Sequence, residues 1–226
     1  MKFLLYFLLI QFPTDIENHI QNGIKILTQN KSIVLDIKNT SATQGSEALS
    51  IVFPEMVRWS GIKDFFETKI NQALYIKNGV AGANFSIGYF QMKPNFIEKL
   101  EEYITQNPAL GTFSYVVIKE KSLEKVRTIR INRLTQIAWQ LRYAHVYWLV
   151  AKDKFKHRYF KDVKERIRFF ATAYNYGFYR DECEIENWQQ KKAFPHGSHF
   201  KGKQVAYADL AIEFFEKYAM LFEEKH

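Results

Sequence analysis

The sequence predicts a mainly α fold, α+β only to the extent of a small β-hairpin, and three observations support this expectation. Apolar side chains recur at intervals of three and four residues over most of the 226 residues, which is the spacing of one helix face. Strand-like patterns are confined to two short runs, residues 32–37 and 113–118. The composition, with 47% apolar and 25% charged residues, is typical of a globular domain and excludes a disordered chain.

The helices can be placed in order along the chain. The segment TDIE from residue 14 has the pattern of a helix start, with Glu17 placed to reach back to the first turn. Asn95 is expected to cap a further helix, because Glu98 three residues later completes a capping box. The apolar stripes that indicate the remaining helices lie at residues 49–59, 134–148, 160–174 and 205–222.

Composition divides the chain into three segments. Residues 1–13 form a signal or apolar amino-terminal segment, because Lys2 precedes an apolar run too short to cross a bilayer as a helix. This start predicts export to the periplasm or cell envelope, without a transmembrane span; a buried first strand or helix is the alternative. Residues 14–45 form an amino-terminal extension, which the polar stretch 38–46 connects to the main domain, residues 46–226.

The formal charge of +8 comes entirely from the second half of the chain. Residues 119–226 hold 22 Lys and Arg against 14 Asp and Glu, and residues 152–168 are the densest part. A positive field of this kind attracts polyanions such as nucleic acid, anionic lipid or an anionic cell-wall polymer. The same charges can instead form the solvated faces of helices. The single cysteine, Cys183, excludes an internal disulfide bridge.

The residues best suited to chemistry occur in three segments: FPEMVRW at residues 53–59, SIGYFQMKP at 86–94 and ATAYNYGF at 171–178. Glu55 lies between Val52 and Met56, beside the apolar stripe of its helix. Burial among apolar groups disfavours a carboxylate and raises its pKa, and a general acid near neutral pH requires such a raised pKa. An exposed Glu on a helix surface is the alternative.

These segments resemble, in the same order, the three signatures of the lysozyme-like superfamily that contains lytic transglycosylases and goose-type lysozymes. The signatures are a helix-borne Glu, a Gly-Leu-Met-Gln-like turn followed by Pro, and a Tyr-Asn-x-Gly at the end of a later helix. The resemblance covers about residues 46–222. It implies a lysozyme-like helical domain that cleaves the MurNAc-GlcNAc bond of peptidoglycan without a metal or an organic cofactor. Peptidoglycan glycan strands would be the partner, and no nucleic acid is expected.

The resemblance also implies a role for each matching residue. Glu55 would be the catalytic acid and then base, Tyr174 would reach it, and Asn175 would support the site. A transglycosylase would take the second proton from the sugar's own 6-hydroxyl, whereas a goose-type lysozyme would admit water, and the sequence leaves both outcomes open. The substrate-binding residues implied are Gly88, Tyr89, Phe90, Gln91, Met92, Tyr174 and Asn175.

Three features depart from the family pattern. Met56 stands where transglycosylases usually have Ser, residues 60–86 form an insertion, and Pro54 removes a backbone donor. If Pro54 began a new helix, the positive helix end would lower the pKa of Glu55. The hypothesis therefore expects a helix that begins around Ser46 to continue past Pro54, with Glu55 near its carboxyl end.

Other groupings favour other interpretations. Asp64 and Glu67 could supply a second carboxylate, although surface charge is the simpler explanation. A non-catalytic cell-wall-binding or assembly module, which keeps the cleft without turnover, is the main alternative function. A basic nucleic-acid-binding helical protein that uses residues 152–168 is a further one. The histidines do not have the paired ligands of a metal site, and they are His145, His157, His196 and His199.

Overall fold

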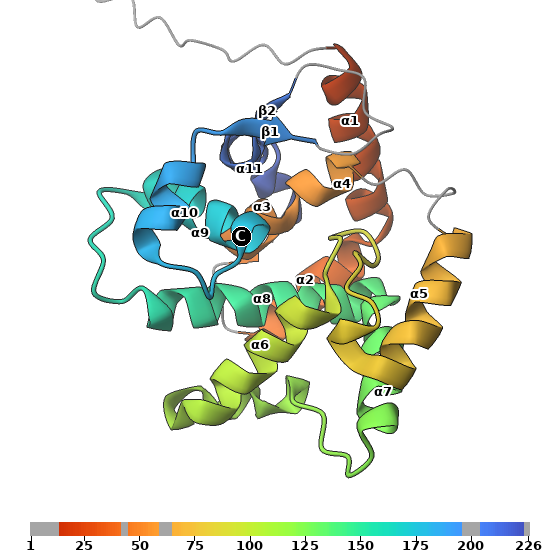
Figure 1. The fold of residues 1–226 in the computed structure, drawn as a ribbon. Helices are drawn as coiled ribbons and strands as arrows, with labels where there is room; N and C mark the ends of the chain where they lie inside the picture. Colours follow the sequence, from red (N-terminus) through yellow and green to blue (C-terminus); the bar gives the residue numbers. More distant parts are fainter. Residues whose placement is uncertain (1–13, 42–44, 59–64, 196–203, 224–226) are drawn as a thin grey trace, which may run out of the picture.

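The computed structural model describes residues 14–41, 45–58, 65–195 and 204–223, and it is mainly helical (Figure 1). The expected mainly α fold with a small β-hairpin is confirmed. Within these ranges, no helix combines the length and the apolar character needed to span a bilayer. The predicted signal segment, residues 1–13, lies outside the described residues.

The elements are α1 (Thr14–Gln29), α2 (Lys31–Ser41), α3 (Gly45–Val52), α4 (Pro54–Arg58), α5 (Phe65–Asn78), η1 (Gly79–Ala81), α6 (Pro94–Gln106), η2 (Pro108–Val116), α7 (Leu123–Leu134), α8 (Ile137–Lys154), α9 (Val163–Tyr176), α10 (Glu182–Trp188), β1 (Lys192–Phe194), β2 (Val205–Ala206), α11 (Tyr207–Lys217) and η3 (Ala219–Phe222).

Helix α8 crosses the middle of the molecule, and most of its residues are buried (Figure 1). Helices α2, α3, α6 and α7 all pack against it. A helix that is apolar around most of its circumference is buried on several sides, which explains this central place. Helix α8 thereby helps to place two of the candidate site segments, because α3 leads into α4 and α6 begins at the end of the SIGYFQMKP segment.

Helices α3, α9 and α11 pack together on one side of α8. Glu47 of α3 is 2% exposed and accepts two hydrogen bonds from Arg166 of α9, at 2.7 Å from Nη2 and 3.0 Å from Nε. The indole of Trp148 on α8 donates a third, at 3.1 Å. A buried carboxylate needs such partners, so this cluster fixes α3, α8 and α9 relative to one another.

The amino-terminal extension, residues 14–45, shares the apolar core of the rest of the chain. Ile16, Ile20 and Leu27 of α1 are buried in the same cluster as the side chains of α8 and α9. Helix α1 approaches α4 closely at Gly23, where a Cβ atom would lie 3.0 Å from the ring of Phe53. Helix α1 therefore packs against α4, the short helix that carries Glu55.

Both predicted strands are wrong. Residues 32–37 lie in α2, because their spacing places Val34 and Ile37 together on the helix face that packs on α8. Residues 113–116 belong to the 3-10 helix η2, and no described strand runs beside them to pair with. The β-hairpin consists instead of β1 and β2, which pair antiparallel with Lys192 opposite Ala206.

The predicted polar connection, residues 38–46, is also shorter than expected. Helix α2 continues to Ser41 and α3 begins at Gly45, so residues up to 41 and from 45 onward are helical. The predicted cap of α6 is wrong as well. That helix begins at Pro94, so Lys93 takes the N-cap position and makes no side-chain cap hydrogen bond. Glu98 accepts hydrogen bonds from Tyr75 and Arg130 instead of closing a capping box.

The chain breaks its helix at Pro54, contrary to the expectation of one continuous helix. Helix α3 ends at Val52 and α4 begins at Pro54, so Glu55 lies in the first turn of α4. Proline has no N–H and its ring disturbs the preceding helical turn, so the first position of a new helix suits it. The break turns the chain, and the buried residues of α4 include Glu55 and Met56.

Candidate active site

Glu55 is the central residue of the candidate site, and it is buried to 5% exposure. Phe53 precedes its helix and stacks on Phe214 of α11, with ring centroids 4.1 Å apart. Met56 follows Glu55 and is also in the core. The apolar environment that the sequence predicted for this glutamate is therefore present, although the helix that carries it is a short new one.

The segment around Gly88 forms a closed turn opposite Glu55. The backbones of Ile87 and Met92 exchange two hydrogen bonds of 3.1 Å, which close the turn at its base. Gly88 has φ +72°, and a Cβ atom there would lie 1.8 Å from Nε2 of Gln140. Only glycine tolerates this combination of a left-handed backbone and close contact. The side chain of Gln140 then accepts a 2.9 Å hydrogen bond from the backbone N–H of Phe90.

The carboxyl end of α9 forms the second wall. The hydroxyl of Tyr174 is buried and donates a 2.7 Å hydrogen bond to the carbonyl oxygen of Phe90, in the turn. The side chain of Asn175 lines the same cleft as Glu55 and lowers the pKa of its carboxyl. Gly177, with φ +120°, ends the helix directly afterwards. The phenol of Tyr174 was expected to reach Glu55, but its hydroxyl holds the turn instead.

Burial raises the pKa of Glu55 from its ordinary 4.5 to about 7. The Arg58 guanidinium, the Asn175 side chain and the Lys93 ammonium all lower this pKa, but desolvation outweighs them. The position of Glu55 in the first turn of α4 was expected to oppose a raised pKa. Burial is the larger effect here because the carboxyl is almost completely removed from water.

One oxygen of Glu55 has no hydrogen-bond partner in the described structure. This oxygen, Oε2, is buried, and the nearest cation is Nη1 of Arg58 at 4.0 Å. That distance is too long for a hydrogen bond. A buried carboxyl oxygen in this state favours the protonated form of the group.

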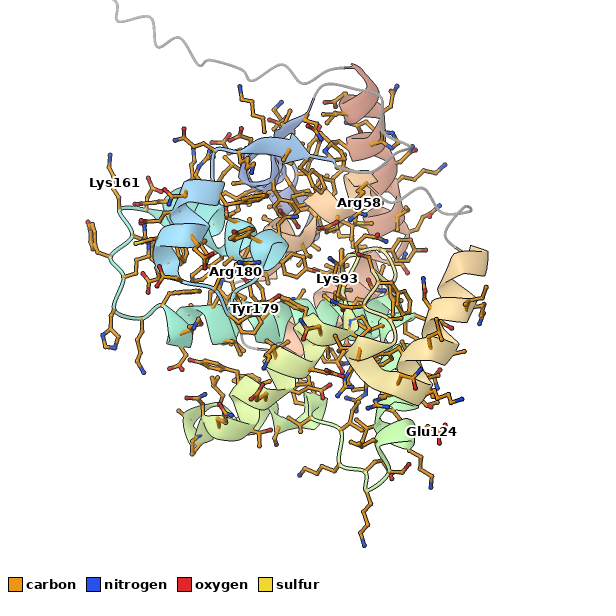
Figure 2. The ribbon with its side chains drawn as sticks, viewed as in Figure 1. Arg58, Lys93, Glu124, Lys161, Tyr179 and Arg180 are labelled. Carbon is orange, nitrogen blue, oxygen red and sulfur yellow. The ribbon has the colours of Figure 1, made fainter. Side chains whose placement is uncertain are left out.

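A cleft with a volume of about 130 Å³ is lined in part by Glu55. Figure 2 shows Arg58 and Lys93 near one another, with Tyr179 close by. Glu55 is the sole carboxylate among the described residues that line it. The lining residues are Glu55, Arg58, Asn84, Ser86, Gln91, Met92, Lys93, Asn95, Phe96, Tyr174, Asn175, Tyr176, Gly177 and Tyr179.

The structure brings five of the eight predicted site residues to this cleft, from three separate segments: Glu55, Gln91, Met92, Tyr174 and Asn175. The other three do not line it. Phe90 is fully buried and offers its backbone to Tyr174 and Gln140. Tyr89 is half-buried against the core, and Gly88 permits the turn.

Sequence analysis missed several residues around Glu55. Arg58 lies one helical turn after Glu55, and Lys93 follows the turn motif directly, so their positions next to the motifs were the available signal. Tyr207 had no such signal. Its charge interaction with Glu55 comes from α11, and its hydroxyl donates a 3.2 Å hydrogen bond to the carbonyl oxygen of Ile51.

The structure also bears on the basic stretch, the metal site and the second carboxylate considered from the sequence. In the basic stretch 152–168, several cations pair with carboxylates of other elements, so the stretch is largely part of the fold. Arg158 pairs with Glu186, and Arg168 pairs with Asp209. Among the described residues, no group of three or more potential ligands could hold a metal ion. His196, His199, Asp64 and the side chain of Glu67 lie outside the described part.

The fold and the cleft together define a mainly helical protein with one buried glutamic acid at a cleft mouth that also contains two basic residues. No family model, curated protein or solved structure matches this chain.

Proposed function

We propose that this protein cleaves the glycan strands of peptidoglycan, as a lytic transglycosylase or a lysozyme-like glycosidase, with Glu55 as general acid and then general base. The observation that supports the proposal most is the state of Glu55. Its carboxyl is buried, its pKa is about 7, one of its oxygens has no partner among the described residues, and the residue lines a cleft. Such a group holds a proton near neutral pH and can donate it to a glycosidic oxygen.

The proposed reaction uses one carboxyl group in two steps. The Glu55 proton moves to the oxygen of the MurNAc-GlcNAc bond, the C1–O bond breaks, and the leaving sugar departs as an alcohol. The substrate's own N-acetyl oxygen stabilises the positive centre at C1. The Glu55 carboxylate then takes a proton from the 6-hydroxyl, whose oxygen bonds to C1 to close an anhydro ring, or from water, which gives a reducing end.

The composition of the cleft supports a mechanism with a single carboxylate. Glycosidases that use two carboxyl groups place both beside the scissile bond. Here Glu55 is the sole acidic residue among the described residues of the lining. The Asn175 side chain lowers the pKa of Glu55, so it would stabilise the carboxylate that forms in the first step.

The proposal is tested by incubating the purified protein with peptidoglycan sacculi and analysing the soluble fragments by mass spectrometry. Glu55→Gln should reduce fragment release by roughly 10²–10⁴-fold, because the amide cannot donate the proton. Glu124→Gln is the matched control, since Glu124 is exposed at the start of α7 and far from the cleft (Figure 2). Anhydro-ended fragments would identify a transglycosylase, and reducing ends a hydrolase.

A second candidate function is a non-catalytic cell-wall-binding module. The observation that favours it is the position of Glu55 in the first turn of α4, one turn before Arg58, which favours the ionised carboxyl. Binding of the unmodified protein to sacculi without release of any fragment would support this candidate and contradict the enzymatic one. Either function would take place in the cell envelope, and a fusion reporter in living cells would test that location.

A further inference from the structure

The cleft contains two cations that the proposed acid chemistry does not require. Arg58 comes from α4, and Lys93 comes from the N-cap position of α6, directly after the closed turn. Both line the cleft and both act electrostatically on Glu55, so they lie on the same side of the molecule as the acid (Figure 2). A cation beside a general acid lowers its pKa, so these residues oppose the protonated state.

Neither cation has a strong partner within the described part of the chain. The Arg58 guanidinium has one ionic contact there, the 4.0 Å approach to Glu55, and its side chain is 30% exposed. Lys93 is exposed and pairs with no described carboxylate. Other arginines of the fold differ, since Arg130 and Arg166 each make two hydrogen bonds to a single buried carboxylate.

The charge of the cleft is therefore positive in either state of Glu55. Among the described residues of the lining, two cations face no anion when the acid is protonated, and one positive charge remains in excess when it is ionised. Arginine and lysine with free donors bind carboxylate groups through charge-assisted hydrogen bonds. A neutral sugar strand would leave these donors without a charged partner.

We infer that Arg58 and Lys93 bind a carboxylate carried by the glycan strand, so that the cleft selects an acidic strand over a neutral one. This inference rests on the proposed function. Two sources would present the same chemistry: the lactyl carboxylate of a strand without peptides, and a carboxylate of a peptide still attached to the strand. Where a peptide is attached, the lactyl group is an amide and has no negative charge.

Binding measurements by calorimetry test the inference, with Glu55→Gln as the background that prevents turnover. The probes are peptide-free glycan strands, strands with intact peptides, and neutral chitin oligosaccharides of similar length. Arg58→Gln and Lys93→Gln are each expected to weaken binding of an acidic probe by roughly tenfold, the loss typical of one charge-assisted hydrogen bond. Binding of the neutral oligosaccharide should stay unchanged. Weaker binding of the peptide-free strands would identify the lactyl carboxylate as the bound group. Weaker binding of the strands with intact peptides would identify a peptide carboxylate.

Lys121→Gln is the matched control, because it removes one positive charge from an exposed lysine outside the cleft lining. Equal affinity of the two cleft variants and this control for all three probes would overturn the inference. Equal losses for neutral and acidic probes would overturn it as well, and so would absence of any binding by the Glu55→Gln background. Failure of the proposed function can be told apart from failure of this inference. In that case Glu55→Gln would release as many fragments as the unmodified protein, while the charge-dependent binding persists.

Discussion

The hydroxyl of Tyr174 donates a hydrogen bond of 2.7 Å to the carbonyl oxygen of Phe90, and it thereby joins the end of α9 to the turn before α6. These residues are 84 positions apart in the chain. The phenol was expected to reach Glu55, but its single O–H is used on the turn. The neighbouring Asn175 lines the cleft with Glu55 and lowers the pKa of its carboxyl. Tyr174 therefore holds the turn in place, and Asn175 acts on the acid.

Tyr174→Phe should destabilise the fold by about 1–3 kcal/mol, because it leaves the buried carbonyl of Phe90 without a donor. The ring itself stays packed against Phe96, whose centroid lies 5.0 Å away. Urea unfolding followed by circular dichroism measures this free energy. Tyr159→Phe is the matched control, since Tyr159 is 83% exposed and its loss should change stability by less than about 0.5 kcal/mol. Equal midpoints for the two variants would contradict the role assigned to the Tyr174 hydroxyl.

Gly88→Ala should be strongly destabilising, by roughly 2–4 kcal/mol, because it combines backbone strain with a clash. The added Cβ would lie 1.8 Å from Nε2 of Gln140 and would displace the amide that holds the backbone of Phe90. Thermal unfolding measures the loss. Gly111→Ala offers a control with the same chemical change, since a Cβ atom there has no neighbour within 4 Å among the described residues. Similar melting temperatures for both variants would show that the turn is not constrained as described.

The raised pKa of Glu55 makes the free energy of unfolding depend on pH. The folded state holds this proton up to about pH 7, whereas the ordinary pKa of the group is 4.5. The contribution of Glu55 to the free energy of unfolding is therefore fully present below pH 4.5, and it is lost as the pH rises through about 7. The loss is on the order of 3 kcal/mol. Glu55→Gln should remove this contribution, so its stability should fall less between about pH 4.5 and pH 7.5 than that of the unmodified protein in urea titrations.

The matched variant for this measurement is again Glu124→Gln, which alters an exposed carboxyl. It should keep the pH dependence of the unmodified protein. A Glu55→Gln variant with an unchanged slope would mean that the carboxyl titrates near its ordinary pKa.

Arg58→Gln should shift the pH dependence of cleavage. Arg58 is the largest of the influences that lower the pKa of Glu55, so its removal should raise this pKa above about 7. A general acid loses activity as pH rises through its pKa, so the alkaline limb of the kcat/KM profile should move to higher pH. Lys121→Gln should leave the limb in place. A shift of the limb in the acidic direction would contradict the charge arrangement around Glu55.

Much of the helical fold follows from local patterns. The start of α1 at Thr14 and the stripe of α9 were predicted because cap residues and three-four spacing are signals within a few residues. The predicted strand at 32–37 was wrong because β-branched residues also fit a helix when a neighbour such as α8 covers their face. The capping box at Asn95 was wrong because Pro94 itself takes the first helical position.

Part of the candidate site was also predicted from local patterns in the sequence. Glu55, Gln91, Met92, Tyr174 and Asn175 stand in recognisable segments, and the structure brings them to one cleft. Arg58 and Lys93 have no strong carboxylate partner in the described part of the chain, and the sequence carried no signal of this because it depends on which carboxylates fold nearby. The approach of Tyr207 from α11 is likewise a property of packing between distant elements.

The sequence by itself determined the helical class, the apolar neighbours of Glu55 and the three segments that carry the candidate site. Tertiary structure alone decided that α3 breaks at Pro54, that the Tyr174 hydroxyl holds the turn, and that Glu55 keeps a raised pKa despite its place in a first helical turn. The physical reason is that desolvation and hydrogen-bond partners depend on elements far apart in the chain. Spacing along one segment does not define them.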